Sequence, residues 1–258
     1  MHRVEPKVFL VAESKLLSGA QDYMDHLGTK WTPSAPVASD PEVLVEMMGR
    51  LCYRSWEPGM NANVTKVREG NAEYLANILK SGHGSVLEHA TMSFIFADVS
   101  RVFTHELVRH RAGMAFSQES LRFVRLTDLG LWLPPQFEED PTIKDLFEST
   151  FRNLEELQLK MAAIFDLDNP TKKFKDKKVL TSAMRRAAPI GLATTIGATF
   201  NVRALRHVIE MRTSEGAEAE MRLVFGNVAS IAKKRWPNLF QDMNKTDNGE
   251  WVFTNHKI

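Results

Sequence analysis

Apolar side chains recur at helical spacing in several stretches of the chain. In 142–166, for example, Ile, Leu, Phe and Met side chains fall on one face, as in a helix that packs against a core. The same reasoning predicts helices over 41–52, 69–81, 142–166, 181–188 and 202–234, the last with a bend near Gly216. Asp40 is the expected cap of the first of these helices. A shorter helix is predicted to run from Ser100, its expected cap, toward Arg109.

Shorter runs of β-branched and aromatic residues predict strands between these helices. The expected strands are 7–12, 90–99 and 190–200, with 123–135 as strand or loop, and the expected loops are 32–40 and 56–63. The lysine-rich run 172–178 predicts a loop or a solvated helix face. Helices and strands mix without a regular alternation, which favours an α+β fold over a doubly wound sheet. Since no repeat or clear linker divides the chain, one domain over 1–258 is expected.

The charge of the chain is nearly balanced, with 33 Lys and Arg against 32 Asp and Glu. This balance indicates neither a nucleic-acid-binding nor a membrane-binding surface, and no apolar stretch is long enough to span a bilayer. The first residues lack the apolar core of a signal peptide, so a cytoplasmic location is expected. The single cysteine, Cys52, rules out an internal disulfide and a Cys-rich metal site. Its apolar surroundings predict a small buried side chain rather than a catalytic thiolate.

The common nucleotide-binding and hydrolase motifs are missing from the sequence. No G-x-G-x-x-G follows a strand, no Gly-rich loop ends in Gly-Lys-Ser/Thr, and no G-x-S-x-G is present. His83 and His89 are six residues apart, which does not place both on one helix face as metal ligands. No metal site is therefore expected, and any nucleotide or flavin must be held by other means.

Polar side chains gather instead in four segments, two of which are short turns. In the first, His83 and Ser85 flank a glycine that lets a planar ligand approach the backbone closely. A turn at the end of a helix is the alternative. In another, Arg185 and Arg186 precede Pro189 and could reach a phosphate. A solvated helix end is the alternative there.

The longest polar segment begins with Arg109-His110-Arg111 and ends with Ser120-Leu121-Arg122, with Gln118 between them. Arginine presents a rigid fork of donors that matches phosphate oxygens two at a time. Ser and Gln side chains supply donors and acceptors for a sugar or a base edge. The segment therefore indicates a nucleotide clamp, with a charged, solvated helix end as the alternative.

The last segment, 201–212, is predicted to be helical. Its spacing places Asn201, Leu205, Val208 and Arg212 on one stripe and Arg203, His207 and Glu210 on the next. An arginine beside core-facing Leu205 and Ile209 is unusual, because a partly buried guanidinium needs a partner. That partner is either an acidic side chain of the fold or an anionic ligand.

Together these segments resemble the flavin-dependent thymidylate synthases, a family that methylates dUMP. The resemblance rests on Arg109-His110-Arg111 followed by Ser120-Leu121-Arg122, with a His-x-Ser turn before them and an Asn-x-Arg helix after them. It extends from the helix before Cys52 to about Phe240. It implies an α+β fold with a bent, mainly antiparallel sheet flanked by helices. It also implies a homotetramer whose active sites are shared between chains.

The resemblance further implies a role for each matching residue. FAD would be contacted by His83, Ser85, Arg109, His110, Arg111, Gln118, Asn201, Arg203 and His207. The nucleotide dUMP would be held by Arg109, Ser120, the backbone of Leu121, Arg122, Arg185 and Arg212. Arg212 would lie against the uracil and favour its ionised N3, which raises the electron density at C5. In the implied reaction NADPH reduces FAD, and the reduced flavin supplies a hydride as the one-carbon unit of methylenetetrahydrofolate passes to C5.

Four positions depart from the family pattern. The spacer between Arg111 and Ser120 is one residue longer than usual, and Glu106 stands where Gln is common. Gly216 stands where His is common, and His207 stands where Asn is frequent. The first two departures bear on the nucleotide geometry, and the last two bear on the flavin and folate contacts.

Two alternatives to dTMP synthesis stay open at the level of sequence. One is a flavin-dependent C5-methylase of another pyrimidine nucleotide, such as UMP. The other is a flavin- or nucleotide-binding homologue without turnover, which the longer spacer and Glu106 would suit.

Overall fold

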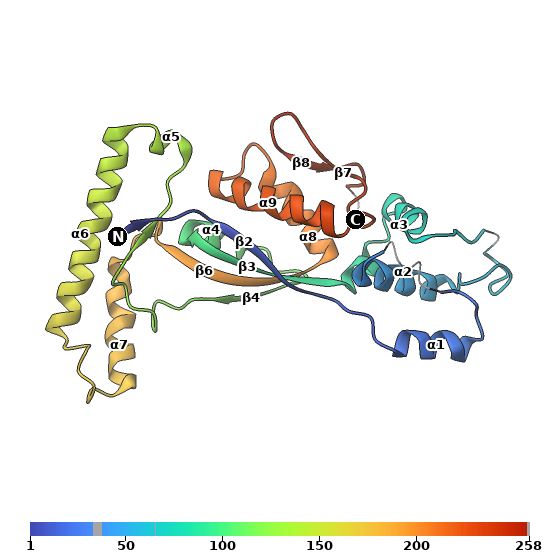
Figure 1. The fold of residues 1–258 in the computed structure, drawn as a ribbon, viewed down its shortest axis with the longest axis horizontal. Helices are drawn as coiled ribbons and strands as arrows, with labels where there is room; N and C mark the ends of the chain where they lie inside the picture. The colour runs from blue at the N-terminus through green and yellow to red at the C-terminus, as the bar shows by residue number, and fades with distance from the viewer. Residues whose placement is uncertain (33–37, 65, 257–258) are drawn as a thin grey trace. The chain divides into compact units, whose positions relative to one another are not determined.

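The computed structural model describes residues 1–32, 38–64 and 66–256, and Figure 1 shows its helices and strands. The strands are β1 (His2–Arg3), β2 (Lys7–Glu13), β3 (Thr91–Ser100), β4 (Met114–Gln118), β5 (Gly130–Leu131), β6 (Ala193–Asn201), β7 (Met243–Lys245) and β8 (Trp251–Phe253). The α-helices are α1 (Gly19–Leu27), α2 (Asp40–Tyr53), α3 (Asn71–Lys80), α4 (Arg101–Leu107), α5 (Pro135–Glu138), α6 (Pro141–Ile164), α7 (Phe174–Met184), α8 (Val202–Thr213) and α9 (Ala219–Arg235). Two 3-10 helices, η1 (Gly84–Glu88) and η2 (Arg185–Ala187), complete the described elements. Within the described ranges, no helix is long and apolar enough to cross a membrane.

Four strands form one sheet in the order β2-β3-β6-β4. In each neighbouring pair, the end of one strand lies beside the start of the other. Backbone hydrogen bonds of 3.0 Å join these ends, from Ser14 to Thr91, from Val202 to Ala90 and from Glu119 to Thr195. All three pairings are therefore antiparallel. The predicted α+β class with a mainly antiparallel sheet is confirmed. The short strands β1 and β5 pair in parallel, and β7 and β8 form an antiparallel pair.

Contacts divide the chain into two compact units. Unit 1 consists of Met1–Phe9, Ile95–His110 and Phe116–Ala198, and unit 2 consists of Leu10–Phe94, Arg111–Ala115 and Thr199–Ile258. The four strands of the sheet contribute residues to both units. The expectation of a single domain over 1–258 stays a prediction.

Unit 1 packs its core against the long helix α6. One cluster consists of Leu121, Leu129, Leu131, Leu133, Phe151 and Leu192, and a second consists of Ala162, Leu167 and Met184. Helix α7 runs beside α6, as Figure 1 shows. The amide of buried Gln158 on α6 donates to the Met184 carbonyl at 3.1 Å, which holds the end of α7 in place. Arg185 begins η2 directly after this anchored residue.

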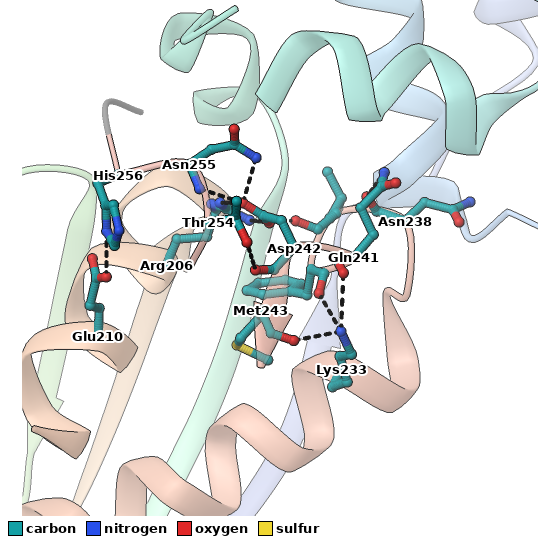
Figure 2. Close-up of polar contacts among 12 residues, drawn as sticks. Arg206, Glu210, Lys233, Asn238, Gln241, Asp242, Met243, Thr254, Asn255 and His256 are labelled. Atoms are coloured by element: carbon teal, nitrogen blue, oxygen red, sulfur yellow. Dashed lines mark hydrogen bonds and ion pairs between the residues drawn. The ribbon is translucent and has the colours of Figure 1, made fainter. Parts of the chain in front are cut away.

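Unit 2 packs α8 against α9 and α2 against α3. Its core contains Phe94, Phe200 and Phe225, which meet edge to face with ring centroids 6.0 and 6.4 Å apart. Figure 2 shows a buried ion pair of the same unit, in which two nitrogens of the Arg206 guanidinium donate to the Asp242 carboxylate at 2.8 and 2.9 Å. Arg206 lies between core-facing residues of α8. Of the two partners expected for such an arginine, an acidic side chain or an anionic ligand, the structure contains the acidic side chain, Asp242.

Two predicted helices end earlier than expected. The helix predicted over 202–234 is broken at 214–218 rather than bent, because Ser214 adopts an extended backbone and the Glu218 carboxylate caps the start of α9. The helix from Ser100 ends at Leu107 and does not reach Arg109. The Arg109 and His110 N–H groups bond to carbonyls only three residues back, which is a tight ending of 3-10 type.

Other local predictions also need correction. Ser39, not Asp40, caps α2, since Ser39 and Glu42 form a capping box there. Cys52 is exposed rather than buried. In the lysine-rich run, by contrast, one of the two predicted alternatives is found, because helix α7 starts at Phe174 and includes 174–178. The elements α1, β4, β7 and β8 were not predicted, and most of the loop expected over 32–40 lies outside the described residues.

Candidate functional site

The junction of β3 and α4 places an arginine in an unusual setting within unit 1. The Ser100 hydroxyl accepts the Phe103 N–H at 3.1 Å, so α4 begins at Arg101. Arg101 Nη1 is buried and has no hydrogen-bond partner among the residues that the structure describes. Burial, and then the positive charge of Arg185, lower the pKa of Arg101 below its usual value. A buried, unsatisfied donor beside a second arginine is costly, and an anionic ligand would satisfy both.

The residues after α4 continue this polar region of unit 1. Arg109 is exposed and follows α4 by two residues, so its guanidinium is open to a ligand from solvent. Gln118 ends β4 and donates through Nε2 to Thr104 Oγ1 at 3.0 Å, which ties the end of β4 to α4. The Glu119 carboxylate accepts the Thr195 N–H at 3.1 Å, so it is directed toward β6.

The Ser120-Leu121-Arg122 motif forms a tight turn after β4. The N–H groups of Phe123 and Val124 both bond to the Ser120 carbonyl, at 2.9 and 3.0 Å. Leu121 is only 8% exposed and packs in the core of unit 1, so its side chain anchors the turn. Only its backbone can then serve a ligand, as the resemblance implies. Arg122 is exposed, and its carbonyl accepts the Thr181 hydroxyl of α7 at 2.8 Å.

Cationic side chains line a hollow beside this turn. Arg122, Lys175, Lys178 and Arg186 border a cavity of about 460 Å³ in unit 1. Lys178 Nζ also lies 4.9 Å from the ring centroid of Phe123, a cation–π contact. The positive charge of side chains from the turn, α7 and η2 favours an anionic ligand here.

In unit 2, His83 lies in the turn between α3 and η1 and contacts Tyr53 in two ways. Its Nε2 is 3.1 Å from Tyr53 Oη, and the two rings stack with centroids 5.5 Å apart. His83 Nδ1 is buried and, within the described part of the chain, has no hydrogen-bond partner. Both rings border a cavity of about 210 Å³. Ser85 lies two residues further on, exposed on η1.

The candidate residues of α8 lie at its start and along its exposed face. The Asn201 side chain caps the helix by accepting the Ala204 N–H at 2.8 Å, so Asn201 precedes the helical stripe predicted for it. Arg203 and His207 are four residues apart and both exposed, which places them on one face. Arg203 pairs with Glu88 of η1 at 2.6 Å. This pair joins α8 to η1, the element that carries Ser85.

The spacer after Arg111 turns at Gly113, against Asn201. Gly113 has a φ of +71°, and its carbonyl accepts the Asn201 N–H at 2.8 Å. A Cβ at this position would lie 2.7 Å from Asn201 Cγ, which real structures do not tolerate. The longer spacer therefore depends on glycine at this turn.

The predicted site residues are divided between the units. Unit 1 holds Arg109, His110, Gln118, Ser120, Leu121, Arg122 and Arg185, and unit 2 holds His83, Ser85, Arg111, Asn201, Arg203, His207 and Arg212. Their ligand contacts stay predictions. No three His, Cys, Asp or Glu residues among those described could hold a metal ion.

Two candidates were missed from the sequence, Arg101 and Tyr53. The sequence could have indicated Arg101, because this cationic residue directly follows the strand that ends at Ser100. Tyr53 gave no signal, because its contact with His83 joins two separate segments of the chain.

A family model described as "Thymidylate synthase complementing protein" matches residues 36–238 of this chain. The chain belongs to this family. Relatives named flavin-dependent thymidylate synthase include one from Mycobacterium marinum (strain ATCC BAA-535 / M), 38% identical over 197 residues that cover 74% of this chain and 76% of the relative. Another, from Corynebacterium diphtheriae, is 33% identical over 218 residues that cover 83% of each chain. The resemblance to the flavin-dependent thymidylate synthases is thereby confirmed.

Solved structures share the fold of this chain. One is thymidylate synthase X from Helicobacter pylori with FAD and dUMP, with a TM-score of 0.53 and 21% identity over 78% of this chain and 91% of that one. Another is the UMP/dUMP methylase PolB from Streptomyces cacaoi bound with 5-Br UMP, with a TM-score of 0.60 and 18% identity over 92% and 94%. At these identities the likeness supports the fold.

Proposed function

We propose that this protein is a flavin-dependent thymidylate synthase that converts dUMP to dTMP. Overall, dUMP, methylenetetrahydrofolate, NADPH and a proton give dTMP, tetrahydrofolate and NADP⁺. Bound FAD would carry the reducing electrons from NADPH to the one-carbon unit. Membership of the family over residues 36–238, with Arg109-His110-Arg111 and Ser120-Leu121-Arg122 both present, carries this proposal.

The residues of unit 2 suit a flavin dinucleotide by their chemistry. FAD has an anionic pyrophosphate and a ring with carbonyl and nitrogen acceptors. Exposed Arg111 and Arg203 match the pyrophosphate. His83 Nδ1, which is buried and has no partner among the described residues, matches the acceptors of the ring. In unit 2, FAD would be held by His83, Ser85, Arg111, Asn201, Arg203 and His207. The same role is proposed for three residues of unit 1, namely Arg109, His110 and Gln118.

The residues of unit 1 suit the nucleotide. The buried donor of Arg101 and the adjacent charge of Arg185 favour a phosphate, and Arg109 and Arg122 add exposed cations. Ser120 and the backbone of Leu121 would orient the sugar and the base.

Arg212 of α8 is proposed as the catalytic group. Its guanidinium would lie against the uracil and stabilise negative charge on the ring, which raises the electron density at C5 where the new carbon bond forms. It is partly buried, as a group that works away from bulk water should be.

UMP is a second candidate substrate. The neighbour PolB is named a UMP/dUMP methylase, and its fold covers 92% of this chain. A pocket that admits the ribose 2′-hydroxyl would accept UMP, and one that excludes it would select dUMP.

Tritium release from C5-labelled nucleotides tests both candidates. With FAD, NADPH and methylenetetrahydrofolate present, dUMP is expected to release label faster than UMP. Faster release from UMP would reverse the assignment of the substrate. If the protein bound flavin but released label from neither nucleotide, it would be a flavin- or nucleotide-binding homologue without turnover.

Variants of Arg101 test the phosphate assignment. Arg101→Gln is expected to raise the KM for dUMP about tenfold or more, because a charge-assisted hydrogen bond to phosphate is lost. FAD binding should stay unchanged. Arg152→Gln is the matched control, since Arg152 is an exposed arginine of α6 paired with Glu148. An unchanged KM in Arg101→Gln would remove Arg101 from the site.

The resemblance also supports a homotetramer with active sites shared between chains. Light scattering on the purified protein would measure the mass, and mixed oligomers of two differently inactivated chains would regain activity only if sites are shared. A cytoplasmic location stays a prediction.

A further inference from the structure

Tyr53 contacts the His83 imidazole in two ways, through ring stacking and at one ring nitrogen. The stacked rings, inclined by 21°, set the plane of the imidazole, and the Tyr53 Oη to His83 Nε2 distance of 3.1 Å engages one of its two nitrogens. Tyr53 ends α2, while His83 follows α3, so two helices contribute to the pair. The other nitrogen, Nδ1, is buried without a partner in the described residues.

The direction of this hydrogen bond determines what Nδ1 can do. A neutral imidazole carries one proton, on either nitrogen. A phenol is a stronger acid than a neutral imidazole N–H, and an imidazole nitrogen is a stronger base than a phenol oxygen, so Tyr53 is the favoured donor. The proton of His83 is then on Nδ1. A buried, unpaired N–H costs free energy until an acceptor reaches it.

We propose that Tyr53 is a positioning residue that holds His83 as the Nδ1–H tautomer and so presents a donor to an acceptor on the flavin. This rests on the proposed function, in which His83 contacts FAD. Tyr53 itself touches no ligand in this scheme and acts only through the imidazole. In catalytic and metal-bound histidines, a hydrogen bond at one ring nitrogen likewise determines whether the other ring nitrogen is protonated.

The tautomer can be measured without any cofactor. Long-range ¹H–¹⁵N correlation spectra distinguish the protonated from the unprotonated ring nitrogen, and His83→Asn identifies the His83 signals. At a pH where the imidazole is neutral, the native protein is expected to show the proton on Nδ1. Tyr53→Phe keeps the ring stacking but removes the hydroxyl, so it should shift the population toward Nε2–H. A native protein with the proton on Nε2, or a variant with no shift, would overturn the proposal.

Flavin titration tests the consequence for binding. Tyr53→Phe is expected to raise the Kd for FAD about threefold to tenfold, the loss of one hydrogen bond, while the Kd for dUMP stays unchanged. Tyr23→Phe is the matched control, because Tyr23 lies in the same unit and its ring meets Trp56 rather than His83. Adding Tyr53→Phe to His83→Asn should cause no further weakening, since Tyr53 acts through His83. Additive losses would contradict that pathway.

The two experiments separate this inference from the proposed function. A native protein that binds no FAD would defeat the proposed function, whatever the spectra show. A native protein that binds FAD, with a Tyr53→Phe variant that binds it equally well, would defeat only the role of Tyr53.

Discussion

Gly113 is the residue on which the spacer after Arg111 depends most. Its φ of +71° is unfavourable for any residue with a Cβ, and the Asn201 side chain occupies the space that a Cβ would need. Gly113→Ala is therefore expected to destabilise the protein by at least about 2 kcal/mol. It should also weaken FAD binding, because Asn201 is a proposed flavin contact. Urea unfolding and flavin titration would measure the two effects.

Gly216 offers the matched control for Gly113. Nothing lies within 4 Å of the position that its Cβ would take, and its φ is not in the left-handed region. Gly216→Ala should leave the free energy of unfolding close to that of the native protein. A Gly113→Ala variant as stable as Gly216→Ala would mean that the turn relaxes without cost.

Single residues were predictable from the sequence only where a motif named them. Arg109 to Arg111 and Ser120 to Arg122 stand out by residue type and spacing. The importance of Arg101 could not be read in the same way, because the second charge comes from Arg185 in a distant segment. Contacts of this kind depend on the tertiary fold, which local patterns do not encode.

At the scale of elements, the packing of α2 against α3 leaves no room for a Cβ at Gly49. A Cβ there would lie 2.6 Å from Tyr74 Oη. Alanine favours a helix over glycine by about 1 kcal/mol, but overpacking a core costs about 1–3 kcal/mol. The Tyr74 ring is buried and lies 4.5 Å from the Arg50 guanidinium, so it has little room to move, and overpacking should win. Gly49→Ala is expected to lower the free energy of unfolding by about 1–2 kcal/mol.

Gly226, in α9, tests the same substitution where there is space. Nothing lies within 4 Å of its would-be Cβ, so Gly226→Ala should stabilise the protein by up to about 1 kcal/mol through helix propensity alone. Thermal or urea unfolding would compare the stabilities of Gly49→Ala and Gly226→Ala with that of the native protein. If Gly49→Ala were as stable as Gly226→Ala, the approach of α2 to α3 would be looser than the structure indicates.

The helices with long apolar faces, α2, α3 and α6, were predicted to within a few residues because burial imposes their period. The break at 214–218 was missed, since it depends on the Glu218 cap rather than on a Pro or on an interruption of the apolar spacing. Strands β4, β7 and β8 have only three to five residues, too few for an alternating pattern to be recognised.

For the whole molecule, one buried ion pair with a lowered carboxyl pKa should contribute strongly to the response to acid. Carboxylates with a lowered pKa include Glu13, Glu57, Asp128, Glu138, Glu156 and Asp242. Among these, Asp242 is only 8% exposed and is paired with Arg206, which is 4% exposed. Burial raises the pKa of Asp242, but the hydrogen bonds and charge of Arg206, with help from Asn255, outweigh it and leave the pKa below its ordinary value.

The sign of the effect follows from this lowered pKa. The unfolded chain binds the proton more readily than the folded one, so ionised Asp242 stabilises the protein at neutral pH. This contribution to the free energy of unfolding is fully present above about pH 5. It is lost as the pH falls below the pKa of an unfolded Asp, about 3.9, and through the lower pKa of Asp242 in the folded protein. Asp242→Asn should therefore unfold more easily at pH 7, by about 3–5 kcal/mol, because Arg206 is left buried without its anion. It should also lose part of the acid dependence, since no carboxylate remains there to be protonated.

Urea unfolding at a series of pH values from about 7 to 3 would measure the slope of the free energy of unfolding against pH. Glu156→Gln is the control, because the Glu156–Lys160 pair is exposed on α6 and salt-screened, so its removal should leave the slope nearly native. The Arg206–Asp242 pair also joins α8, which carries Arg203, His207 and Arg212, to the segment before β7, as Figure 2 shows. Loss of bound flavin should thus accompany the loss of stability in Asp242→Asn. If the variant kept both the native slope and the native flavin affinity, the ion pair would be dispensable for the fold and for the position of α8.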